Sequence, residues 1–194
     1  MEIEFVSACN DGDIQKVLRL ISKGARNWNW GLIAACEGGH IDIVKIFLDK
    51  GATSYNSGML IACQHGYLDI VKLLIDKGYT NGNRIIVEHG AMFACKNGHT
   101  NIVSYMLSLS LNDWNMGLLN ACEEGQEEVV KLLLTSEYKK YFNLDDGLSI
   151  AYKNKHLNIV SLLLTKGANI DNEDIEFKLD DLEYLFRVLG KYDF

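Results

Sequence analysis

The sequence predicts an all-α solenoid in which short helical hairpins stack side by side, and three observations point to it. The dipeptide Ala-Cys occurs five times, at intervals of 27, 27, 32 and 27 residues, and an Ala-Tyr pair follows 30 residues later. A Val lies nine residues after the Ala of all six copies. The apolar residues that follow each copy recur at helical spacing, which indicates helices with one buried face. Repeats of this length cannot bury that face alone and therefore stack.

Composition fits a folded protein that needs no disulfides. The chain has 194 residues, of which 48% are hydrophobic and 23% charged, enough to bury a sizeable core. No apolar run reaches the roughly 18 residues of a membrane span, and the first ten residues are acidic where a signal peptide is basic. We expect an intracellular, cytoplasmic protein with no membrane partner. The net charge is −7 and no basic stripe occurs, so nucleic acid is not an expected partner either.

Each repeat is predicted to contain two short helices. The first, such as 32–37, is rich in small residues, and a Gly-rich break follows at 38–39. The second helix opens with Asp, Glu or Asn in its first turn, where the helix dipole favours negative charge. In several copies it ends in Lys-Gly, a common helix stop. Insertions that lengthen the period fall between the helical units, at 80–89 and about 136–145.

The best copy reads GLIAACEGGHIDIVKIFLDKGA at 31–52. This pattern resembles the ankyrin repeat, with Gly in place of the Pro of the Thr-Pro-Leu-His opening. The period of 27 is shorter than the family's usual length of about 33. The resemblance therefore implies an ankyrin-repeat solenoid of stacked helix-turn-helix units with shortened β-turn fingers. The tract 27–32, echoed at 112–118, is similar to short ankyrin repeats of giant DNA viruses.

We expect residues 1–194 to form a single ankyrin-repeat domain. Residues 3–26 keep the register but lack the opening Gly and the His, which suggests an N-terminal cap repeat, and five repeats follow over 27–170. Residues 171–194 do not repeat the motif and are predicted to form a capping helix that covers residues 162–164. Its apolar face would consist of Leu179, Leu182, Leu185, Phe186 and Leu189.

The sequence offers no catalytic constellation, because H-E-x-x-H, G-x-S-x-G, Walker and dinucleotide-binding motifs are all absent. The five cysteines share one repeat slot, which indicates small buried thiols rather than ligands or disulfides. Reduced thiols in turn fit an intracellular compartment. The family resemblance implies that His40, His99 and His156 bond the backbone of a neighbouring turn. We expect no enzyme activity, cofactor, metal or small-molecule substrate.

Two kinds of slot are too variable for packing and should face outward. One lies directly before the opening Gly, and the other is the pair after Ala-Cys. By contrast, the slot three residues before the Gly is always large and apolar, as in Trp28, Tyr55 and Trp114, and should pack between repeats. In ankyrin proteins the outward positions line a concave groove that holds partners. The candidate partner-binding residues are Trp30, Gln64, His65, Arg84, His89, Lys96, Met116, Glu123 and Glu124, with Arg84 on the 80–89 insertion, which we expect to project as a longer finger.

The leading hypothesis is a monomeric, non-enzymatic scaffold that binds another folded protein through the concave face. If the viral resemblance holds, the partner is a host protein and the chain is an effector or adaptor in the host cytoplasm. The alternative is a self-associating structural protein, in which finger residues or Leu185, Phe186 and Leu189 form a homodimer or a larger array.

Overall fold

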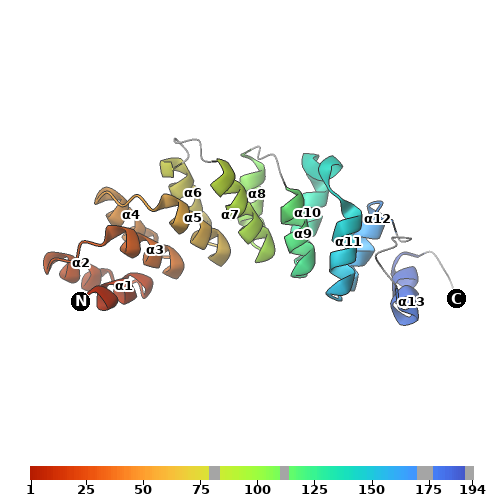
Figure 1. Cartoon of the computed structure of the whole chain (residues 1–194), viewed down its shortest axis with the longest axis horizontal. Helices are drawn as coiled ribbons and strands as arrows, with labels where there is room; N and C mark the ends of the chain where they lie inside the picture. The colour runs from red at the N-terminus through yellow and green to blue at the C-terminus, as the bar shows by residue number, and fades with distance from the viewer. Residues whose placement is uncertain (79–83, 110–113, 170–176, 191–194) are drawn as a thin grey trace. The chain divides into compact units, whose positions relative to one another are not determined.

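The structure is a computed structural model that describes residues 1–78, 84–109, 114–169 and 177–190. These residues form helices and no strand (Figure 1). Contacts between Cα atoms divide the chain into two compact units, Met1–Ala94 and Cys95–Phe194. The helices are α1 Glu2–Asn10, α2 Ile14–Ser22, α3 Trp28–Gly38, α4 Ile41–Asp49, α5 Tyr55–His65, α6 Leu68–Gly78, α7 Arg84–Lys96, α8 Thr100–Leu107, α9 Asn115–Glu123, α10 Glu127–Thr135, the 3-10 helix η2 Glu137–Tyr141, α11 Leu144–Lys153, α12 Leu157–Thr165 and α13 Leu179–Val188.

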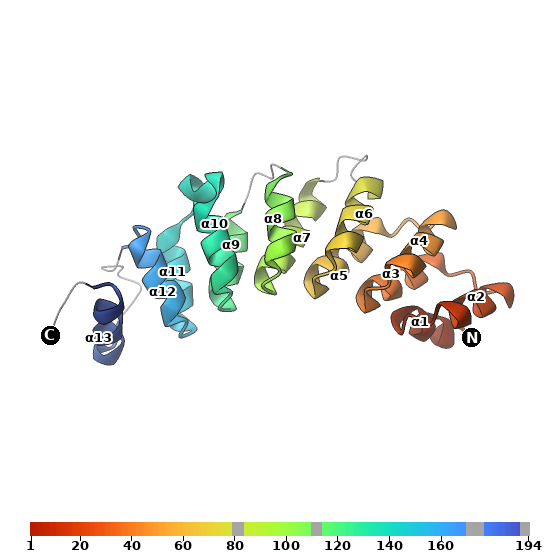
Figure 2. The same ribbon diagram turned by 180° about the vertical axis from the view of Figure 1, so that it is seen from behind.

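Helical hairpins α1–α2, α3–α4 and α5–α6 stack in the first unit (Figure 2). The first helices α1, α3 and α5 contact one another in order, and α4 contacts α6. The first helices begin earlier than the sequence suggests, since α3 starts at Trp28 rather than at residue 32. The Trp28 ring lies 6.4 Å from the Phe5 ring and 6.2 Å from the Phe47 ring. This contact confirms the packing role predicted for the Trp28 slot and places it in the first helical turn.

The small residues of the repeat allow neighbouring hairpins to approach closely. A Cβ added to Gly58 would lie 2.9 Å from Sγ of Cys36 in the preceding repeat, and one added to Gly117 would lie 3.1 Å from Sγ of Cys95. All five cysteines are buried free thiols, as predicted. Because burial disfavours the thiolate, the pKa of Cys36 is raised to about 12.

The second unit repeats the same architecture. Helix α9 contacts α11, while α10 contacts both α8 and α12. The connection between α10 and α11 contains η2, which packs against α10. Trp114 is buried, as predicted for its slot, and its ring lies 6.2 Å from the Tyr138 ring of η2.

Helix α13 covers α12 at the end of the second unit. Leu185 is fully buried in this contact, but Leu179 is 72% exposed. The prediction that Leu179 belongs to the buried face is therefore wrong. The first turn of α13 is attached by polar groups instead: the Tyr152 hydroxyl accepts a hydrogen bond from the backbone N–H of Lys178 (2.9 Å) and donates one to Oδ2 of Asp181 (2.8 Å).

The repeat at the start of the chain departs from the others at two slots. Asp13 occupies the slot of His40 and caps α2, since its Oδ1 accepts a 2.9 Å hydrogen bond from the backbone N–H of Lys16. Glu4 occupies the slot of Gly31, and its Oε1 lies 3.6 Å from Nζ of Lys16. Both side chains therefore contact Lys16 of their own hairpin.

Candidate protein-binding surface

The slot before the opening Gly faces solvent in every repeat that has one. Trp30 is 59% exposed and Met116 46% exposed. Ser57, His89 and Asp146, which fill the same slot on α5, α7 and α11, are exposed as well. The outward orientation predicted for this slot is confirmed.

The pair after Ala-Cys is also exposed at the C-terminal ends of the first helices. In the first unit Gln64 and His65 end α5, and the His65 ring stacks on the Tyr67 ring at 6.1 Å. In the second unit Nζ of Lys96 lies 3.2 Å from Oε1 of Glu124, with both side chains more than 40% exposed. Such a surface pair contributes at most about 1 kcal/mol, so these residues set local charge rather than stability.

Framework residues hold the backbone of these exposed pairs. Nε2 of His156 lies 3.0 Å from the carbonyl oxygen of Glu123, and Nε2 of His40 lies 2.7 Å from that of Asn10. Gln126, which occupies the same slot, donates a 3.1 Å hydrogen bond to the carbonyl oxygen of Lys96. The backbone contacts predicted for His40 and His156 are confirmed. Gln126 fixes the backbone of Lys96 and His156 that of Glu123, so each of these repeats positions exposed residues of the one before it.

The candidate residues fall into two groups, one in each unit. Trp30, Gln64, His65 and His89 belong to the first unit, and Lys96, Met116, Glu123 and Glu124 to the second. The ion pair between Lys96 and Glu124 directly joins two members of the second group.

The insertion at 80–89 is not a projecting finger throughout. Residues 84–89 form the first turns of α7, with Arg84 as its first residue. Val87 is buried in the slot that Trp28 fills in α3, and this packing extends the helix toward its N-terminus. Residues 80–83 and the Arg84 side chain lie outside the described residues, so the predicted role of Arg84 stays a prediction.

Sequence reasoning missed two exposed residues beside His89. Ile85 is 63% and Phe93 39% exposed. With His89 they lie four residues apart on one face of α7, because positions i and i+4 are neighbours on a helix. We call Ile85, His89 and Phe93 the α7 stripe. Counting four residues in both directions from His89 would have found it.

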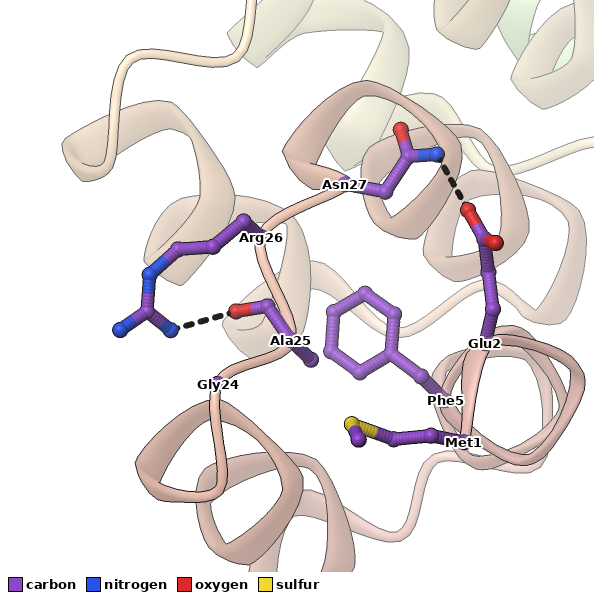
Figure 3. A pocket seen from close by; sticks show the side chains of 7 residues that line it. All are labelled: Met1, Glu2, Phe5, Gly24, Ala25, Arg26 and Asn27. Carbon is purple, nitrogen blue, oxygen red and sulfur yellow. Dashed lines mark hydrogen bonds between the residues drawn. The ribbon is translucent and has the colours of Figure 1, made fainter.

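An open pocket of about 590 Å³ lies beside α1 in the first unit. One hydrogen bond joins α1 to the connection 23–27, since Nδ2 of Asn27 donates to Oε1 of Glu2 (2.8 Å). A second lies within the connection, where Nη1 of Arg26 donates to the carbonyl oxygen of Ala25 (2.7 Å). Figure 3 shows both bonds, with the Met1 and Phe5 side chains between them. The lining residues of the pocket are Met1, Glu2, Phe5, Gly24, Ala25, Arg26 and Asn27.

Two further features bear on the kind of site. In the part of the chain that the structure describes, no three His, Cys, Asp or Glu side chains are grouped as metal ligands would be. No helix within the same residues is long and apolar enough to cross a bilayer.

Stacked helical hairpins with a constant framework and variable exposed slots define a helical repeat protein. The sequence matches the family described as "Ankyrin repeats (3 copies)" over residues 5–86 and 91–174. The chain therefore belongs to the ankyrin-repeat family, and the predicted fold class is confirmed. Ankyrin repeats are generally protein–protein interaction modules, and the fold is typically a non-catalytic scaffold.

The structure is similar to the crystal structure of the human ASB11 ankyrin repeat domain, with a TM-score of 0.71 and 21% sequence identity. The match covers 95% of this chain and 96% of that chain. At this level of identity the likeness concerns the fold alone. No curated protein sequence matches the chain.

Proposed function

We propose that this protein is a non-enzymatic scaffold that binds a partner protein through the outward slots of its first helices. The observation that carries the proposal is the exposure of large apolar side chains in or beside those slots. Trp30, Ile85, Phe93 and Met116 are between 39% and 63% exposed. Side chains of this kind are disfavoured on surface that binds no partner and are common in the energetically important centres of interfaces.

The two units offer different chemistry to a partner. In the first unit Trp30 and the α7 stripe are apolar or aromatic, apart from the imidazole of His89. In the second unit Met116 accompanies the charged residues Lys96, Glu123 and Glu124. A partner would bury the apolar residues as anchors, while the charged residues would act as a polar rim. Hydrogen bonds from the framework hold this surface in place before binding, which lowers the entropy cost of association.

The proposal includes an intracellular location for the protein and a host protein as its partner. Five free, buried cysteines support an intracellular location, because thiols persist where the environment is reducing. The likeness of the tracts 27–32 and 112–118 to viral ankyrin repeats supports a host protein as the partner, bound in the host cytoplasm.

Affinity capture from cell lysate tests the proposal with a triple variant, Trp30→Ala, Phe93→Ala and Met116→Ala. All three side chains lie on the outward surface, and the melting temperature of the variant is measured to show that its fold is retained. We expect it to lose a protein that the wild type captures. With that protein purified, each single substitution should weaken binding by about fivefold or more, as expected for interface anchors.

The matched control is Leu18→Ala, which removes a side chain that is 43% exposed but lies on the second helix α2, outside the outward slots of the first helices. It should capture the same protein as the wild type. Equal capture by the wild type and the triple variant would move the binding surface elsewhere and contradict the proposal.

A further inference from the structure

The connection between α10 and α11, residues 136–143, differs from those in the first unit. The connections 23–27 and 50–54 contain five residues each, whereas this one contains eight and includes η2. It also contains Lys139-Lys140, the only two adjacent basic residues in a chain of net charge −7. We call residues 136–143 the η2 connection.

Contacts at both ends fix the η2 connection to the second unit. The Tyr138 ring packs against buried Trp114, and the backbone N–H of Asn143 donates a 3.0 Å hydrogen bond to Oδ1 of Asn115. At the start, the Ser136 hydroxyl donates to the carbonyl oxygen of Leu133 (2.6 Å). The packing requirement of this segment is therefore met by Tyr138, and the residues that follow it are not needed for stacking.

Those residues form an exposed basic and aromatic platform. Tyr141 is 65% exposed, and both lysines are exposed. Nζ of Lys140 lies 4.9 Å from the centre of the Tyr141 ring, within the range of a cation–π contact. This contact limits the freedom of a long side chain and presents its ammonium group beside an exposed ring. Tyr with its apolar ring and polar hydroxyl is favoured at interfaces.

The carboxylates near the η2 connection do not pair with its two lysines within the described residues. Glu137 is the first residue of η2, but neither Lys139 nor Lys140 forms an ion pair within the described residues. Oδ1 of Asp145, in the first turn of α11, accepts a 2.7 Å hydrogen bond from the backbone N–H of Asn169. In the described part of the chain the two ammonium groups therefore have no carboxylate at ion-pair distance, although Glu137, Asp145 and Asp146 are close to them in the sequence.

We propose that the η2 connection binds an acidic segment of a partner protein, with Lys139 and Lys140 pairing with carboxylates and the Tyr141 ring packing on the segment. Charge complementarity identifies the occupant, because the platform presents two adjacent exposed lysines that form no ion pair within the described residues. A nucleic acid is disfavoured, since two lysines cannot offset the repulsion between a phosphate backbone and a net charge of −7. This surface is separate from the outward slots, so it can fail or hold independently of the proposed function.

Titration with a synthetic oligo-glutamate peptide, followed by amide NMR shifts, tests the proposal on the full chain. Two exposed ion pairs and one ring give weak binding, with a dissociation constant on the order of 0.1 to 1 mM. We expect the largest shifts at residues 137–142. We also expect the affinity to fall as ionic strength rises from about 0.05 to about 0.5 M, because salt screens exposed charges.

Substitutions then distinguish binding at the η2 connection from a general effect of the protein's net charge. Lys139→Gln with Lys140→Gln should raise the dissociation constant about tenfold. The control, Lys153→Gln with Lys166→Gln, changes two exposed lysines of the same unit and should leave it within about twofold. Tyr141→Ala should weaken binding, whereas Tyr141→Phe should retain it.

Three results would overturn the proposal. The first is an equal loss in both lysine pairs, which would indicate only a net-charge effect. The second is the absence of shifts at residues 137–142 at low salt. The third is a single-stranded DNA oligonucleotide that binds more tightly than the peptide, which would make the platform a nucleic-acid site.

Discussion

The glycine that opens each repeat illustrates at the residue scale how closely the two helices of a hairpin approach. A Cβ on Gly31 would lie 2.7 Å from the buried Phe47 ring of α4. A Cβ on Gly147 would lie no closer than 3.4 Å to any side chain, with Leu163 instead of Phe at the position equivalent to Phe47. The same slot therefore tolerates a methyl group in one repeat and excludes it in another.

This difference predicts opposite results for two identical substitutions. Gly31→Ala should destabilise the protein by about 2 kcal/mol, because the Phe47 ring must move within a packed core. Gly147→Ala should be neutral or stabilise by up to about 1 kcal/mol, since Ala favours helix over Gly. Urea denaturation measures both changes, and Gly31→Ala with Phe47→Leu should recover part of the loss. Similar destabilisation by the two single substitutions would show that contact with the second helix does not control this slot.

Buried thiols make stability depend on alkaline pH. Burial raises the pKa of Cys63 from about 9 to about 12, so above pH 9 the unfolded chain loses this proton while the folded protein keeps it. The contribution of the protonated Cys63 thiol to the free energy of unfolding is fully present below pH 9 and is lost as pH rises toward 12. Burial raises the pKa values of the other four cysteines to about 12 as well.

We therefore expect the free energy of unfolding to fall steeply between pH 9 and 11. In Cys63→Ala the slope should be smaller by up to about 1.4 kcal/mol per pH unit, the amount that one proton contributes. Urea denaturation at several pH values measures the slope, which is independent of any constant loss from the smaller side chain. Parallel curves for the two proteins would show that the Cys63 thiol is not the titrating group.

At the scale of elements, periodicity predicts the features that recur in each repeat. Stacking requires the same small or apolar residue at each framework slot, so the hairpins, the buried cysteines and the outward orientation of Trp30 could all be predicted. Features that occur once leave no such pattern. The α7 stripe was missed because Phe93 corresponds to a buried Ala34 in the repeat of α3. The platform of the η2 connection was missed because it lies in an insertion.

Tyr152 is a further single feature, since it fills the slot that holds Cys in the preceding repeats. Its hydroxyl joins the first turn of α13, and its ring lies 4.5 Å from the Phe177 ring. The larger side chain thus connects the last hairpin to a single helix instead of another hairpin. The sequence shows that Tyr152 replaces the Cys of the repeat, but it does not show the contact with α13 that explains the replacement.

Loss of this hydroxyl should loosen α13 without unfolding the repeats. We predict that Tyr152→Phe destabilises docking of α13 by about 1 to 2 kcal/mol, because two hydrogen bonds disappear and the backbone N–H of Lys178 loses its partner. Hydrogen exchange should accelerate in α13 while the rates in α9 and α10 stay unchanged. Tyr184→Phe, which removes an exposed bond to Asn158, is the control and should have a smaller effect. Equal acceleration in both variants would contradict a special role for Tyr152.

At the scale of the whole molecule, the last hairpin differs from the others at the residue that meets the next hairpin. Internal repeats contact the next one through a left-handed Gly, as where a Cβ on Gly125 would lie 2.7 Å from the His156 ring. The corresponding residue of the last hairpin is Lys155, the sole non-glycine residue with positive φ (66°) in the described chain. This hairpin therefore has a side chain at the position where the other hairpins have only a hydrogen atom.

Lys155 at this position argues against association by end-to-end stacking at the last hairpin. Leu185, one of the residues considered for such a contact, is fully buried against α12 within the chain. We predict that the protein sediments with the mass of one chain at all concentrations. Leu185→Asp should release α13, because a carboxylate cannot be buried there without a partner. The uncovered face of α12 should then give concentration-dependent association while the helical content of the repeats is retained. A dimer of the wild-type protein, or a Leu185→Asp variant that stays monomeric with α13 detached, would show that the capping helix does not control association.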